Sequence, residues 1–169
     1  MKQFLALLLC VSCAIPHFIN ASDADIRNSV CIISGKNGDG SGFFTEIEGQ
    51  NMVVTNNHVI LEIKEAKITD VNGNEYKYDT IYSSPAVDLA IIPIDRNNLD
   101  ERPNLQLHPS PDRINGNEEV IAYGNSLGAQ VIVSQEGHFL GIGPDKIEVD
   151  APFVKGNSGG PSLKKAAQK

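Results

Sequence analysis

Many short apolar runs divide the sequence, and Gly, Asn, Asp or Pro interrupts each of them after a few residues. No long segment repeats apolar residues with the 3.6-residue period of an amphipathic helix, which disfavours helical bundles and α/β folds. Short runs rich in Val, Ile and Phe predict β-strands, and a series of them separated by turns predicts a barrel or a sandwich. We therefore expect an all-β fold. The predicted strands cover residues 29–34, 42–45, 52–55, 66–71, 75–78, 89–94, 120–123, 130–135 and 146–149.

A chain of 169 residues is long enough for one domain or for two small packed halves. The polar, proline-containing segment 101–117 predicts a linker between a first β-barrel at 25–100 and a second at 118–169. Asn72-Gly73, between two runs of the first half, predicts a two-residue hairpin turn. The second half has only three clear strands, and the charged tail that follows Leu163 has no β pattern. We therefore expect an incomplete second barrel and a chain truncated after its last glycine-rich segment.

The N-terminus has the organisation of a signal peptide. Lys2 precedes the apolar run 4–11, and small residues that permit cleavage follow at Ala21 and Ala24. The apolar run is too short to span a bilayer; a buried N-terminal helix is the alternative interpretation. We expect a signal peptide at 1–21 and a protein that is extracytoplasmic, either periplasmic or secreted, without a membrane span after the leader is removed.

The net charge of −7 offers no basic surface for nucleic acid or for an anionic membrane. Residues 37–48 resemble an EF-hand loop, but its first position is Asn37 rather than Asp, and both flanks predict strands. With no zinc constellation or phosphate loop either, we expect no metal and no cofactor. Cys31 lies in an apolar run, where an unpaired cysteine acts as a small buried hydrophobe.

Three polar residues in special local contexts indicate nucleophilic catalysis. His58 follows the run Met52–Thr55, Asp88 opens the next apolar run at Leu89, and Ser158 lies within Gly156-Asn157-Ser158-Gly159-Gly160-Pro161. The order His, Asp, Ser is that of the chymotrypsin-type triad. Each residue is expected at a strand end or in a glycine-rich turn, where a rigid scaffold can present it.

The chemistry requires these residue types together. A serine hydroxyl needs a base within hydrogen-bond reach, and the base needs a carboxylate that fixes its tautomer. We assign these roles to Ser158, His58 and Asp88, and expect the backbone N–H groups of Gly156 and Ser158 to stabilise the oxyanion, since glycine turns can aim such groups. Taken alone, each residue has an ordinary structural explanation, and the assignment depends on their agreement. Asp70, Asp79 and Asp95 compete with Asp88 for the role of the carboxylate, whereas His108 and His138 lack this context and are expected at the surface.

The chain resembles trypsin-like serine proteases of the HtrA/Deg type over roughly residues 30–163. The motifs that carry the resemblance are Gly40-Ser41-Gly42-Phe43-Phe44, Val53-Val54-Thr55-Asn56-Asn57-His58-Val59-Ile60, Asp88-Leu89-Ala90-Ile91-Ile92, Val120-Ile121-Ala122-Tyr123-Gly124-Asn125-Ser126-Leu127-Gly128 and Gly156–Pro161. The resemblance implies two perpendicular β-barrels with the site between them, and endopeptidase action on extracytoplasmic, often unfolded, polypeptides. A homo-oligomer is compatible with it.

The sequence also departs from that family. It contains no PDZ domain, so it is similar as well to the bare protease domain of glutamyl endopeptidases. The family places further strands after the serine motif to bind substrate and to wall the specificity pocket, and we expect these strands to be absent here. Two functions follow as hypotheses: a secreted serine endopeptidase, or a non-catalytic protease-like binding module or inactive fragment.

Overall fold

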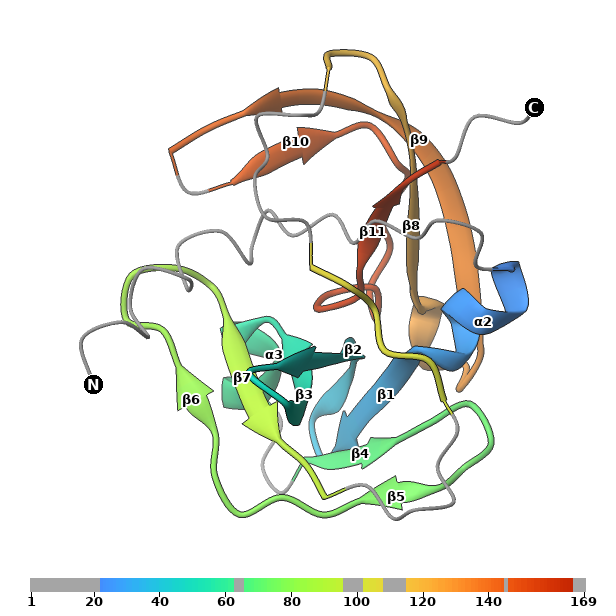
Figure 1. Ribbon diagram of the computed structural model, residues 1–169. Coiled ribbons are helices and arrows are strands. Elements are labelled where there is room, and N and C mark those ends of the chain that lie inside the picture. The colour runs from blue at the N-terminus through green and yellow to red at the C-terminus, as the bar shows by residue number, and fades with distance from the viewer. Residues whose placement is uncertain (1–21, 63–65, 96–101, 108–114, 145, 166–169) are drawn as a thin grey trace.

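The computed structural model describes residues 22–62, 66–95, 102–107, 115–144 and 146–165, and two antiparallel sheets dominate this part of the chain (Figure 1). The first sheet has the order β5-β4-β1-β2-β3-β7-β6. Its strands are β1 Val30–Gly35, β2 Gly38–Ile47, β3 Gln50–Thr55, β4 Lys67–Thr69, β5 Glu75–Tyr76, β6 Tyr82–Ser83 and β7 Ala90–Pro93. The second sheet has the order β10-β9-β8-β11. Its strands are β8 Glu119–Asn125, β9 Ile132–Ile142, β10 Ile147–Val149 and β11 Ser162–Lys164, and the short helices are α2 Asp23–Asn28, α3 Asn57–Glu62 and the 3-10 turn η3 Ser126–Gly128. The all-β prediction is confirmed.

Both faces of the first sheet are buried. On β1, Val30 and Ile32 pack into one apolar core, whereas Cys31 and Ile33 pack into another on the opposite face. Successive side chains of a strand point to opposite faces, so a sheet covered on both sides needs continuous apolar runs. Burial raises the pKa of the Cys31 thiol to about 12, which keeps it protonated, and the predicted packing role of this residue is confirmed.

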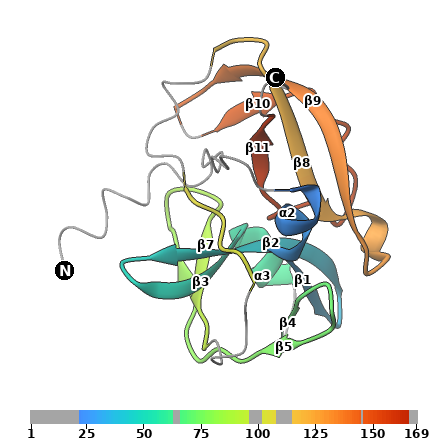
Figure 2. The ribbon, with the colours of Figure 1, turned by 45° about the vertical axis from the view of Figure 1, so that its right-hand side comes forward.

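One core joins the two sheets. Tyr123 on β8, Ile132 on β9 and Leu163 on β11 pack with Val30 and Phe43 of the first sheet. In both ribbon views the second sheet lies across one end of the first (Figures 1 and 2). The two sheets are therefore not independent apolar units.

Helix α2 docks onto the second sheet, as the rotated view shows (Figure 2). Ser22 and Asp25 form a reciprocal capping box at its start. Near its end, the Arg27 guanidinium donates to the carbonyl oxygen of Ile132 and, at 2.9 Å, to Oγ of Ser134. These contacts attach the segment before β1 to strand β9.

The structure differs from the predicted elements at three places. The link between β4 and β5 is a three-residue loop rather than the expected two-residue turn at Asn72-Gly73. The backbone N–H of Asp70 donates to Asn74 O at 3.0 Å, the N–H of Gly73 donates to Asp70 O at 3.1 Å, and the Asp70 carboxylate accepts the N–H groups of Asn72 and Asn74 at 2.9 and 2.8 Å. The segment after the serine motif forms β11, which pairs with β8 although its sequence has no β pattern.

The third difference concerns where β9 begins and which of its residues is buried. We expected a strand over residues 130–135, but Gln130 has a left-handed backbone (φ 61°), β9 starts at Ile132, and Val131 is 56% exposed.

Part of the segment expected to be a linker packs against the first sheet. Leu105 is 1% exposed, pairs with Thr45 in a parallel bridge, and accepts the Thr45 hydroxyl at 2.6 Å. The guanidinium of Arg102 lies 3.7 and 4.0 Å from the ring centroids of Phe44 and Tyr76.

The expected signal peptide at 1–21 lies outside the described residues. In the part of the chain that is described, no helix has the length and apolar character required to cross a bilayer.

Candidate active site

Two adjacent strands bring His58 and Asp88 together. His58 lies in the first turn of α3, directly after β3, and Asp88 lies just before β7, which pairs with β3 through Thr55 and Ala90. Oδ1 of Asp88 accepts the backbone N–H of His58 at 2.9 Å, and Oδ2 lies 2.6 Å from the ring Nδ1. The sequence placed His58 at a strand end, whereas the structure places it one step further, in a short helix.

The Asp88 carboxylate fixes the tautomer of the imidazole. An ionised carboxylate can only accept, so the ring Nδ1 is the donor and Nε2 of the neutral ring is left as an acceptor. Burial acts to raise the pKa of Asp88, but the hydrogen bonds from the backbone N–H and the ring of His58 outweigh it, and the pKa lies below its ordinary value of 3.8. Asp88 is therefore ionised at neutral pH, as an orienting carboxylate must be.

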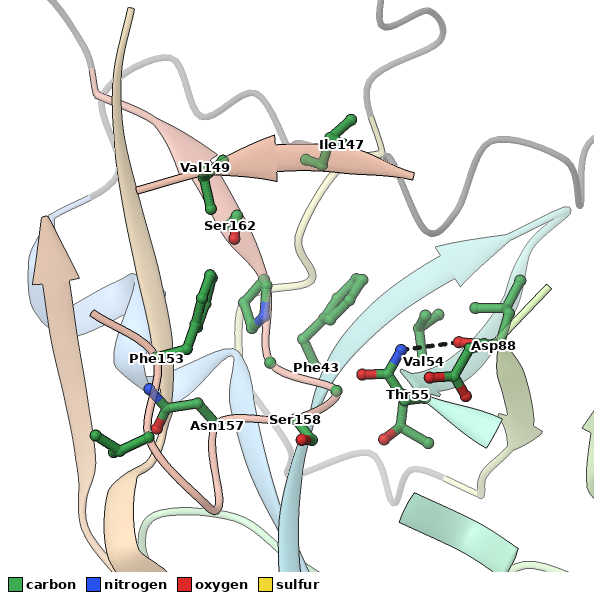
Figure 3. A pocket seen from close by; sticks show the side chains of 16 residues that line it. Phe43, Val54, Thr55, Asp88, Ile147, Val149, Phe153, Asn157, Ser158 and Ser162 are labelled. Carbon is green, nitrogen blue, oxygen red and sulfur yellow. Dashed lines mark hydrogen bonds between the residues drawn. The ribbon is translucent and has the colours of Figure 1, made fainter. Parts of the chain in front are cut away.

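Asn56 holds the backbone of the aspartate loop. Its side-chain amide donates to the carbonyl oxygen of Asp88 at 2.8 Å, which is the dashed line in Figure 3. Because Asn56 directly follows β3, this bond ties the loop before β7 to the same strand end that carries His58.

In the turn around Ser158, the carbonyl oxygens of the four consecutive residues 155–158 all accept hydrogen bonds. Lys155 O accepts the N–H of Leu127 at 2.7 Å, Gly156 O accepts the Ser41 hydroxyl at 2.7 Å, Asn157 O accepts the N–H of Gly160 at 3.0 Å, and Ser158 O accepts the N–H of Ser41 at 2.8 Å. These bonds fix the orientation of every peptide plane in the turn.

Fixing the carbonyls also aims the N–H groups. In a planar trans peptide the C=O and the following N–H point in opposite directions. The N–H groups of Gly156 and Ser158 therefore point away from the donors that hold Lys155 O and Asn157 O. Within the described residues neither N–H has an acceptor, and both are available for an oxygen that carries negative charge.

Two glycines of this turn are required by close contacts. Gly156 has φ 97°, and a Cβ on it would stand 2.0 Å from the carbonyl oxygen of Asn125. Gly159 has φ 85°, and a Cβ there would stand 2.1 Å from the carbonyl oxygen of Ser41. Left-handed backbone and such short separations exclude any side chain, so the serine turn lies directly against β2 and β8.

Asn157, next to Ser158, has both ends of its side-chain amide bound. Its Oδ1 accepts the Ser126 hydroxyl at 2.7 Å and its Nδ2 donates to Oε1 of Gln135. Sequence reasoning did not assign a site role to Ser126 or Gln135, or to the side chain of Ser41. Ser41 carried a recognisable signal, since it is a polar residue between two glycines within a strand.

A cavity of about 310 Å³ lies between the sheets beside Ser158. Figure 3 shows Thr55 and Asp88 on the side of the first sheet, and Phe153 and Val149 on the side of the second, with Ser158 between them. The residues that line the cavity therefore come from both halves of the chain.

Among the residues described, no hydrogen bond joins the Ser158 hydroxyl to His58. Catalytic hydrogen bonds of this kind commonly tighten only when substrate binds.

A second His–Asp pair lies away from this cavity. The backbone N–H of His138 donates to Asp150, and its Nδ1 lies 3.3 Å from Oδ2 of the same residue. The hollow beside it contains the side chains of Glu119, Glu136 and Lys165, none of which is a hydroxyl or thiol nucleophile. The His138 side chain is half-exposed at the surface. His108 lies outside the described residues. Among the described residues, the carboxylate that hydrogen-bonds to His58 is that of Asp88. Of its competitors, Asp70 organises the β4–β5 turn, Asp79 follows β5 and Asp95 follows β7.

Solved structures share this architecture. A serine endoprotease from Yersinia pestis superposes with a TM-score of 0.66 at 22% identity, over 87% of this chain and 55% of that one. An HtrA-type protease described as AlgW with a tripeptide gives a TM-score of 0.67 at 24% identity, over 85% of this chain and 51% of that one. The fold is thus that of the chymotrypsin-like proteases.

The family follows from sequence. A model described as the trypsin-like peptidase domain matches residues 40–168, and the chain belongs to that family. A probable periplasmic serine endoprotease, DegP-like, from Brucella suis is 37% identical over 132 residues, which is 73% of this chain and 25% of that protein. The protein of the same description from Chlamydia pneumoniae is 34% identical over 132 residues, again 73% of this chain and 26% of its own length. The chain spans about a quarter of these relatives.

Proposed function

We propose that this chain is the peptidase domain of a serine endopeptidase, with Ser158 as nucleophile, His58 as general base and acid, and Asp88 as the group that orients His58. The oxyanion would be bound by the backbone N–H groups of Gly156 and Ser158. The observation that carries the proposal is the combination of an Asp88-oriented imidazole with a serine turn whose peptide planes are fixed.

In the proposed reaction, Nε2 of His58 takes the hydroxyl proton as Oγ of Ser158 attacks the carbonyl carbon of the scissile peptide. The carbonyl oxygen becomes an oxyanion and accepts the N–H groups of Gly156 and Ser158. His58 then gives its proton to the departing amine, and an ester remains on Ser158. Water attacks this ester with His58 again as base, which releases the carboxylate and restores the serine.

The cavity supports polypeptide substrates with apolar side chains. Its wall on the second sheet is formed by Ile147, Val149 and Phe153, which would bury an apolar side chain of the substrate next to Ser158. Unfolded polypeptides expose such side chains. We therefore propose them as the substrate class.

The start of α2 supports export with cleavage after Ala21. Such a cleavage leaves Ser22 as the helix cap, whereas cleavage after Ala24 would remove both Ser22 and Asp23. Asp23 pairs with Arg27 and accepts the Tyr123 hydroxyl at 3.0 Å. The mass of the chain recovered from an extracytoplasmic fraction tests this assignment.

A fluorophosphonate probe tests the function. It reacts with a serine that has an activating base and an oxyanion site, so we expect labelling that maps to Ser158 and disappears in Ser158→Ala and after heat denaturation. Ser162 lines the same cavity without these partners and should not be labelled. If the native chain takes no label and hydrolyses no unfolded polypeptide, the proposed function is wrong, and the alternative of a non-catalytic protease-like binding module or an inactive fragment is favoured.

A further inference from the structure

Ser41 lies at the junction of the two sheets, and all of its polar groups are bound. It is 0% exposed in the middle of β2. Its hydroxyl donates to Gly156 O at 2.7 Å and accepts the backbone N–H of Asn125 at 2.8 Å. Its backbone N–H donates to Ser158 O at 2.8 Å, and its carbonyl oxygen accepts the Thr55 hydroxyl at 2.6 Å. One residue of the first sheet thus contacts both the serine turn and the second sheet.

The direction of the Ser41 hydroxyl is fixed by its two partners. A backbone N–H can only donate and a carbonyl oxygen can only accept. The hydroxyl hydrogen must therefore point at Gly156 O, and the oxygen must receive the N–H of Asn125. The resulting chain of two hydrogen bonds is buried, where such bonds strengthen each other.

Gly156 is the residue of the serine turn that most needs such support. Its N–H is one of the two proposed oxyanion donors, and glycine has the least restricted backbone of any residue. The bond from Leu127 holds the peptide before Gly156, and the Ser41 hydroxyl holds the peptide after it. With both planes fixed, the φ of 97° is maintained and the N–H keeps its direction.

We propose that Ser41 is a positioning residue for the oxyanion site, which acts by holding the Gly156 carbonyl through its side-chain hydroxyl. The proposal rests on the proposed function of Ser158. It assigns a role in transition-state stabilisation to a side chain that does not touch the substrate. Without the hydroxyl, the Gly156–Asn157 peptide can rotate and the φ of Gly156 is no longer fixed from both sides. The Lys155–Gly156 peptide, which carries the Gly156 N–H, is then held by the Leu127 bond alone.

Ser41→Ala tests the proposal, and Thr45→Val is the matched control. Thr45 is on the same strand, is 1% exposed, and also donates its hydroxyl to a carbonyl oxygen, that of Leu105, but it does not contact the serine turn. For Ser41→Ala we expect kcat on an unfolded polypeptide to fall roughly 10- to 100-fold with KM within about twofold, since misaiming an oxyanion donor costs somewhat less than removing it. Thr45→Val should lose stability while its kcat stays near that of the native chain.

Two inhibitors of one peptide sequence separate positioning from general loosening. A peptide aldehyde forms a hemiacetal oxygen that binds the oxyanion site, whereas the reduced-amide peptide has no oxygen at that position. Ser41→Ala should weaken the aldehyde by the same factor as kcat and leave the reduced amide within about twofold. If Ser41→Ala does not fold, Ser41→Cys carries the same expectation, because a thiol fills the site but is a weak donor.

Each result has one meaning. Retention of more than half of the native kcat in Ser41→Ala, or equal weakening of both inhibitors, would overturn the positioning role. Failure of the proposed function looks different: the native chain itself would hydrolyse nothing, and its affinity for the aldehyde would not depend on Ser158. That second result would overturn both proposals.

Discussion

Gly159 and Gly73 allow the contact between the serine turn and β2 to be measured separately from backbone strain. Both have a left-handed backbone, with φ 85° at Gly159 and 84° at Gly73. A Cβ at Gly73 would meet nothing within 4 Å, whereas one at Gly159 would stand 2.1 Å from Ser41 O and 2.2 Å from Oγ1 of Thr55. The two Gly→Ala variants therefore share the strain and differ in the collision.

The magnitudes follow from this geometry. Left-handed alanine costs about 1–2 kcal/mol, which both variants should lose in free energy of unfolding. Gly159→Ala should lose about 1–3 kcal/mol more from overpacking. To reach even a tight contact the serine turn must also retreat by about 1 Å, and a misplacement of that size can lower the rate roughly 100-fold.

Urea unfolding and the rate of fluorophosphonate labelling measure the two effects. Gly73→Ala should lower the urea midpoint at an unchanged slope and label at the native rate, while Gly159→Ala should show the larger loss of stability and label at least about tenfold more slowly. The reasoning is refuted if the two variants unfold within about 0.5 kcal/mol of each other and label equally fast.

Three further predictions concern carboxylates. Asp88→Asn offers one oxygen to the two donors of His58, so the ring loses its fixed tautomer, and kcat should fall roughly 10⁴-fold while the fold is retained; unchanged turnover would remove Asp88 from the mechanism. Because the pKa of Asp88 is lower in the folded than in the unfolded chain, ionised Asp88 stabilises the native state above the ordinary value of 3.8, and this contribution is lost as pH falls through the lowered folded value; acid unfolding of Asp88→Asn should lack this component. Asp70 is 1% exposed in its side chain and lies 3.9 Å from Nε of the buried Arg102, so Asp70→Ala should cost about 3–5 kcal/mol in urea unfolding and leave the labelling rate of the folded fraction unchanged.

The strands and the local contexts of the site could be predicted because they depend on nearby residues. The run before His58 and the run after Asp88 became β3 and β7. What the sequence did not reveal is that these two strands are neighbours, since pairing is a tertiary property. The assignment of His58 to Asp88 rather than to Asp70 therefore depended on the apolar run that Asp88 opens, and only the structure supplies the 2.6 Å separation between the His58 ring and Asp88.

The predicted elements that differ from the structure do so for physical reasons that the periodicity of apolar residues does not record. The backbone of Asp70 closes a three-residue loop with Asn74, and its carboxylate also accepts N–H groups of that loop, so the turn is one residue longer than the one expected at Asn72-Gly73. A left-handed Gln130 delays the start of β9 and leaves Val131 outside the core. Strand β11 has one buried apolar residue, Leu163, and exists because β8 offers it a partner. Strands specified by a neighbour rather than by their own pattern are not visible in a sequence.

The same distinction explains why the proposed machinery is divided between the sheets. His58 and Asp88 lie at adjacent ends of β3 and β7 in the first sheet, and they contact each other without a residue of the second sheet. The serine turn has its carbonyl oxygens held by donors from both sheets, namely Ser41 on β2 and Leu127 beside β8. Because these donors have the right positions only when the sheets are docked, the oxyanion site depends on the core that Tyr123 and its neighbours share with β1. We therefore expect packing at the interface of the two sheets to determine whether the proposed oxyanion site forms beside Ser158, while the orientation of His58 requires only the first sheet.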